Sequence, residues 1–145
     1  MSSFHKVTSD IRDQRSLTEA LTLMGYEGVE SHEQAVQLTN AWGEGHGVST
    51  AEVVVRAKAV KAKHKDLYRA SDVGFKRQED GTFALQANDM DSRTFSKDWL
   101  GRVKTAVGTA RTVRMARMKY GCTKPQITEK VVNGRPKTIL RFVIP

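Results

Sequence analysis

The longest regular pattern in the chain is an apolar stripe at helical spacing between residues 93 and 120. Intervals of three or four residues separate its members, which are Phe95, Trp99, Val103, Ala106, Ala110 and Val113. Residues at this spacing lie on one side of an α-helix. No proline interrupts the segment, and Gly121 follows as a helix stop. The pattern predicts one long amphipathic helix that buries this stripe.

Two other stretches alternate between apolar and polar residues on either side of a turn dipeptide. Asp-Gly and Asn-Gly are the dipeptides that tight hairpin turns favour. Two β-hairpins are therefore predicted, with strands over residues 72–77 and 82–87 around Asp80-Gly81, and over residues 127–132 and 137–143 around Asn133-Gly134.

Shorter elements are predicted in the first half of the chain. Alternation indicates a first strand over residues 3–11, and a β-branched run indicates another over residues 52–56. Ser16 and Glu19 fit a capping box, which predicts a short helix over residues 16–24.

Three segments are less regular. A second capping box at Ser31 predicts another short helix that reaches Trp42. Residues 43–50 are rich in glycine and are predicted to form a flexible loop. Residues 57–68 suit a strand, a helix or a loop, because alanine and lysine tolerate all three.

These elements favour the α+β class. Strands and helices in this order predict a single antiparallel sheet, with the short N-terminal helix and the long helix packed on one face. A chain of 145 residues suits one domain, so residues 1–145 are predicted to fold as a single unit.

Charge is distributed unevenly along the chain. Residues 1–50 carry 3 basic and 7 acidic groups, whereas residues 93–145 carry 13 basic and 2 acidic groups. A basic half beside an acidic half indicates an electrostatic surface directed at a polyanion. The chain has one cysteine and no apolar run long enough to span a membrane, so a cytoplasmic location is expected.

Basic side chains are the candidate functional residues. A protein that neutralises phosphates needs several cations on one surface. The predicted long helix, the second hairpin and the lysine cluster at residues 58–65 each provide such cations. The predicted nucleic-acid-binding residues are Arg93, Lys97, Lys104, Arg111, Arg114, Arg117, Lys119, Arg135, Lys137, Arg141, Lys58, Lys61, Lys63 and Lys65, with Tyr68 as a stacking side chain.

Two of these arginines conflict with the helical pattern. Arg114 and Arg117 fall on the apolar side of the long helix, where an isolated buried charge is costly. Either the last turns of the helix project beyond the sheet, or the two arginines meet acidic or phosphate partners. The C-terminal end of the helix is therefore the first place to look for a ligand.

The sequence contains no catalytic or metal-binding motif. The four histidines lack partners at metal-ligand spacing, and the glycine-rich segment lacks the lysine of a phosphate-binding loop. We therefore expect no enzymatic activity, no cofactor and no metal.

The order of several short segments resembles a known family. The segments are Met1-Ser2-Ser3-Phe4, Ile11-Arg12-Asp13, residues 17–26 ending in Met24-Gly25-Tyr26, residues 51–56, Asp72-Val73-Gly74-Phe75, residues 79–83, Tyr120-Gly121 and the final hairpin. Together they are similar to the uncharacterised hypothetical-chloroplast-frame (Ycf-type) proteins of plastids, cyanobacteria and other bacteria, which carry a domain of unknown function. Residues 43–47 and 58–65 depart from that family. The resemblance implies a single α+β domain and assigns no reaction or site residue.

Two functions remain open on this basis. The first is a small non-catalytic nucleic-acid-binding protein that prefers RNA or single strands and binds largely independently of sequence. The alternative is an interaction or assembly factor, whose basic face docks an acidic partner or another copy of itself as a homo-oligomer. No motif for sequence-specific readout is present.

Overall fold

The chain folds into an α+β structure, and its described residues form three α-helices and two antiparallel sheets. The computed structural model describes residues 4–42, 49–121 and 125–142. Its elements in order are β1 (Phe4–Val7), α1 (Gln14–Leu23), β2 (Glu30–Gln37), β3 (Thr50–Val55), α2 (Ala57–Lys63), β4 (Val73–Arg77), β5 (Phe83–Asn88), a 3₁₀ turn (Asp89–Asp91), α3 (Lys97–Tyr120), β6 (Gln126–Val132) and β7 (Arg135–Arg141). The predicted fold class and the predicted long helix are confirmed.

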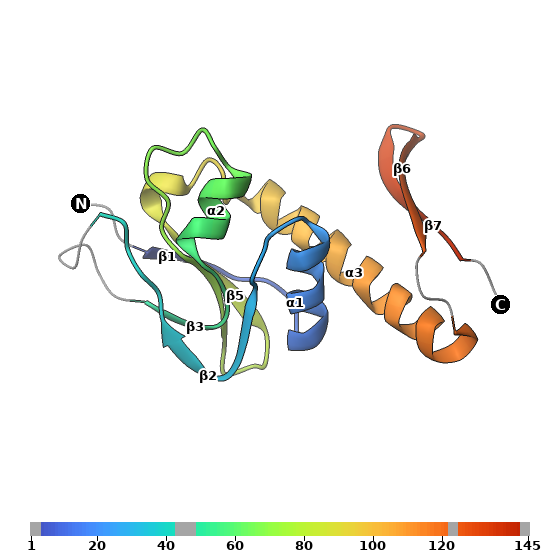
Figure 1. Cartoon of the computed structure of the whole chain (residues 1–145), viewed down its shortest axis with the longest axis horizontal. Coiled ribbons are helices and arrows are strands. Elements are labelled where there is room, and N and C mark those ends of the chain that lie inside the picture. Colours follow the sequence, from blue (N-terminus) through green and yellow to red (C-terminus); the bar gives the residue numbers. More distant parts are fainter. Residues whose placement is uncertain (1–3, 43–48, 122–124, 143–145) are drawn as a thin grey trace.

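The main sheet has five strands in the order β1-β5-β4-β3-β2, and every pair in it is antiparallel. The predicted first hairpin is its centre, with Phe75 opposite Leu85 and Gly81 in the left-handed conformation that the turn requires. Helices α1 and α3 lie against each other on one face of this sheet (Figure 1).

An aromatic cluster forms the centre of the core beneath α3. The Trp99 ring stacks on Phe75 with centroids 6.1 Å apart and meets Phe95 edge-on at 4.9 Å. Trp99, Phe95 and Val103 are all buried, as the apolar stripe predicts. Burying side chains of this size is the main term that holds α3 to the sheet.

The second hairpin forms a sheet of its own, so the prediction of one sheet is wrong. Strands β6 and β7 pair only with each other around Asn133-Gly134, both of which have positive φ. Figure 1 shows the C-terminal half of α3 extending beyond the main sheet, with the hairpin turned back beside it. The alternating residues and the turn dipeptide correctly predicted the hairpin, because they lie within it. They do not determine which part of the molecule the hairpin packs against.

The predicted helix at Ser31 is also wrong, because residues 30–37 form strand β2. This strand pairs with the buried strand β3, with Glu30 opposite Val54 and Gln37 opposite Thr50. Pairing with β3 stabilises the strand conformation here more than the capping residues stabilise a helix.

Several element boundaries differ from prediction. Strand β1 ends at Val7 rather than at residue 11. Helix α1 begins earlier, because Asp13 is its N-cap and accepts a hydrogen bond from the Ser16 amide. Helix α3 begins at Lys97 after the Ser96 cap and ends at Gly121, which has φ of 69°. Most of the predicted loop over residues 43–50 lies outside the described residues, and Thr50 already belongs to β3.

Candidate nucleic-acid interface

The solvent side of α3 carries a line of cations. Lys97, Lys104, Arg111 and Lys119 are exposed, and Arg93 is exposed just before the helix begins. Lys104 does not act as a free cation, because its Nζ atom lies 3.0 Å from an Asp10 carboxylate oxygen. That hydrogen bond is the largest reason why the pKa of Asp10 is lowered.

Arg114 has acidic partners within the chain, which gives it a structural role beside its predicted one as a ligand-binding side chain. Its guanidinium lies 3.1 Å from the Asp13 carboxylate and 3.3 Å from the Glu19 carboxylate, and it donates to the Ser16 hydroxyl at 2.8 Å. These groups belong to the start of α1, so Arg114 ties α3 to α1. The pKa of Asp13 is lowered, first by the Ser16 hydroxyl and also by Arg114.

Beyond Arg114 most side chains of α3 are exposed, whereas Ala116 is still buried. Arg117 is exposed, and so are Met115, Met118 and Tyr120, with 66%, 82% and 46% of their surface accessible. Both interpretations of the arginine conflict are therefore partly right. Arg114 meets acidic partners, whereas Arg117 lies on the turns that project past the sheet.

One face of the second hairpin is cationic. Directly opposite residues of an antiparallel pair share a face, and alternate residues along a strand do too. The register places Lys130 opposite Lys137, Val132 opposite Arg135, and Gln126 opposite Arg141. This basic hairpin face therefore carries Lys130, Arg135, Lys137 and Arg141, and it has no acidic residue.

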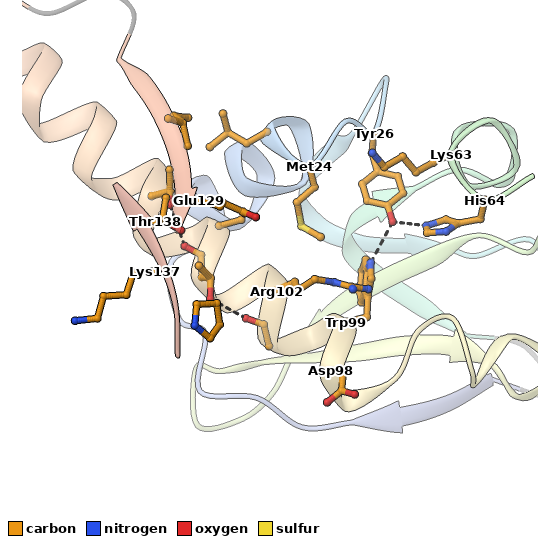
Figure 2. A pocket seen from close by; sticks show the side chains of 17 residues that line it. Met24, Tyr26, Lys63, His64, Asp98, Trp99, Arg102, Glu129, Lys137 and Thr138 are labelled. Atoms are coloured by element: carbon orange, nitrogen blue, oxygen red, sulfur yellow. Dashed lines mark hydrogen bonds between the residues drawn. The ribbon is translucent and has the colours of Figure 1, made fainter. Parts of the chain in front are cut away.

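The two faces of the hairpin have different surroundings. The face with Ile127, Glu129 and Thr138 lines a groove beside α3, and of the basic hairpin face Lys137 also lines it. Figure 2 shows the Lys137 side chain directed away from the other labelled groove residues. Lys130 was not among the predicted site residues; the strand register around Asn133-Gly134 was the signal that places it opposite Lys137.

The lysine cluster does not form one continuous strip. Residues 57–63 are helical, and Lys58, Lys61, Lys63 and Lys65 are all exposed. Lys61 donates to the backbone carbonyls of Lys65 and Leu67, which ties down the turn after α2. Lys63 instead lies across Gly25, so close that an added Cβ there would be 2.8 Å from its Nζ atom.

Tyr68 belongs to a small aromatic cluster with a cation between its rings. Its surface is 82% exposed, and its ring centroid lies 6.4 Å from that of Trp42. The Arg69 guanidinium carbon is 5.2 Å from the Trp42 centroid and 5.6 Å from the Tyr68 centroid. Arg69 was not predicted, and its adjacency to Tyr68 was the only sign of it.

Neither a metal cluster nor a membrane span is found in the part of the chain that the structure describes. No three His, Cys, Asp or Glu side chains within residues 4–42, 49–121 and 125–142 could hold a metal ion together. No helix in these ranges combines the length and apolar character that crossing a bilayer requires.

No family model matches the chain, and no curated protein and no solved structure is similar to it. The resemblance to the Ycf-type proteins therefore stays a prediction.

Proposed function

We propose that this protein is a small non-catalytic nucleic-acid-binding protein, which contacts phosphates through the basic hairpin face and the exposed cations of α3. The observation that carries this proposal is the cluster of four cations on one face of β6–β7. Within the described residues, none of the four forms an ion pair.

A like-charge pair in the middle of this face supports the proposal. Lys130 and Lys137 are directly opposite each other, an arrangement that destabilises an isolated hairpin. A polyanion bound across the two strands removes this repulsion and releases its own counterions. Arg135 and Arg141 lie on the same face on either side of the lysine pair, so the cations follow the length of the hairpin.

The paired acids of the first half favour a foreign polyanion over a second copy of the chain. Asp10 pairs with Lys104, and Asp13 and Glu19 pair with Arg114. Glu30 is held by Arg56 at 2.7 Å. Most of the acidic half is thus neutralised within the molecule, which leaves less negative charge for self-association.

The aromatic cluster favours a single strand. Unpaired bases stack on exposed aromatic rings and on guanidinium planes, and the Trp42–Arg69–Tyr68 cluster offers both. The preference for RNA over DNA rests on the frequency of sheet-based α+β folds among RNA-binding modules, which is an analogy of architecture.

Fluorescence anisotropy with labelled single-stranded RNA, single-stranded DNA and duplex DNA tests the proposal over a series of salt concentrations. We expect binding to weaken steeply with salt. The double variant Lys130→Gln/Lys137→Gln should weaken binding to unrelated sequences alike. It should also reduce the slope of log affinity against log salt by about 1.4 for a single strand, since each lost phosphate contact removes about 0.7.

The double variant Lys6→Gln/Lys58→Gln is the matched control, because it removes the same charge from exposed lysines of β1 and α2, outside the proposed contact surface. It should retain more affinity than the hairpin variant. An affinity that does not change with salt would contradict the proposal. Equal losses of nucleic-acid affinity in the two variants would show that the hairpin contributes no more than other surface cations. Salt-sensitive self-association without nucleic acid would favour the assembly alternative.

A further inference from the structure

A groove of about 680 Å³ lies between α3, the ends of α1 and α2, and the inner face of the β6–β7 hairpin. Its volume is in the range of small-molecule sites. Of the four cations of the basic hairpin face, Lys137 lines this groove, and Lys130, Arg135 and Arg141 do not. The two ends of the groove differ in chemistry (Figure 2).

A buried hydrogen-bonded chain forms the wall at one end. The Trp99 indole N–H donates to the Tyr26 hydroxyl at 3.1 Å, and that hydroxyl lies 2.5 Å from His64 Nε2. An indole nitrogen can only donate, so the Tyr26 hydroxyl oxygen accepts from Trp99 and also shares a hydrogen bond with the His64 ring. Burial raises the pKa of Tyr26 and is the largest cause that lowers the pKa of His64. The wall is therefore fixed and neutral.

Two cations without counterions flank this wall. Lys63 and Arg102 both line the groove, and within the described part of the chain neither forms an ion pair. Both charges are near enough to His64 to lower its pKa further, whereas Asp66 acts in the opposite direction. Asp98 lies one turn before Arg102 and lines the groove, yet it makes no ion pair with that arginine.

The middle and the hairpin side of the groove are largely apolar. Met24 and Leu23 contribute from the end of α1, Ala106 from α3, and Ile127 and Pro136 from the hairpin. Leu23 and Ile127 both line the groove and are 48% and 44% exposed, so they offer apolar surface to a ligand there. Glu129 is the acidic residue on the hairpin side, and it would disfavour a second negative charge there.

We propose that this groove binds a small amphipathic carboxylate, whose charged end lies between Lys63 and Arg102 and whose apolar body lies along Met24, Ile127 and Pro136. An arginine and a lysine that lack acidic partners complement one carboxylate. The apolar lining complements an aliphatic or aryl body. This site is argued from other observations than the proposed nucleic-acid contacts, although Lys137 of the basic hairpin face and Arg102 of α3 line the groove as well.

Isothermal titration calorimetry with octanoate tests the site, with 1-octanol as the neutral probe of equal chain length and inorganic phosphate as the anion without an apolar body. We expect octanoate to bind more tightly than either. The double variant Lys63→Gln/Arg102→Gln should weaken octanoate binding by about tenfold or more and leave 1-octanol unchanged. In the unmodified protein, octanoate should also shift the NMR signals of the His64 ring.

Lys130→Gln on the basic hairpin face is the matched control and should leave octanoate binding unchanged. Equal affinity for octanoate and 1-octanol would overturn the proposal, because the groove would then have no end that recognises a carboxylate. Binding of phosphate without binding of octanoate would overturn it as well, and so would a His64 ring that does not respond. Lys130 does not line the groove, whereas Lys137 does. The single variant Lys130→Gln therefore separates the two proposals, because it should weaken nucleic-acid binding and leave octanoate binding unchanged.

Discussion

Arg114 is a charged residue at an apolar position of α3, and its partners became known only from the structure. Its place on the apolar side of α3 indicated a problem, since a lone buried charge is costly. The sequence could not name the solution, because Asp13 and Glu19 are about a hundred positions away along the chain. The structure brings these acids to Arg114 through the packing of α1 on α3.

We expect Arg114→Ala to destabilise the fold by about 1–2 kcal/mol, because it leaves Asp13 and Glu19 without their shared partner. Urea denaturation followed by circular dichroism measures this change. The exposed Arg111 is the control, and Arg111→Ala should alter the free energy of unfolding by less than about 0.5 kcal/mol. Equal effects of the two substitutions would contradict the structural role of Arg114.

Whole elements were predicted where their own residues decide them. Helix α3 and both hairpins carry complete local signals, which are apolar spacing, a glycine stop and the turn dipeptides, and all three are present. Strand β2 was mistaken for a helix because its β3 partner, and not its own residues, determines its conformation. The position of β6–β7 was missed for the same reason, and the groove beside it could not be predicted.

Gly108 in the interior of α3 allows the contribution of this helix to stability to be tested. Gly108 is exposed, and an added Cβ would meet no atom within 4 Å. We therefore expect Gly108→Ala to stabilise the protein by about 1 kcal/mol, because alanine loses less backbone freedom on forming a helix. Thermal denaturation should show a higher midpoint.

Gly74 in β4 is the opposite case and serves as the comparison. A Cβ at Gly74 would lie 2.5 Å from the Ala51 Cβ and 3.1 Å from Leu38, so Gly74→Ala should lower stability by about 1–3 kcal/mol. A destabilising Gly108→Ala would contradict the open surroundings that the described residues leave at this position.

At the scale of the whole molecule, the hairpin β6–β7 serves two surfaces. Its inner face forms one side of the groove, and its outer face carries the four cations. The class of fold and the basic end of the chain were predictable from pattern and charge. The division of the hairpin into an apolar and a cationic side depends on register, which only the paired strands define.

The order of strands in the main sheet determines the sequence of events in folding. Strands β2 to β5 are neighbours in both sequence and space. Strand β1 instead pairs with the distant strand β5, with Phe4 opposite Asn88. Closing the longer loop costs more entropy, so we expect amides of β4 and β5 to be protected before those of β1 in pulsed hydrogen exchange. Simultaneous protection would contradict this order. During synthesis on the ribosome, the first strand therefore stays without its partner until β5 has emerged.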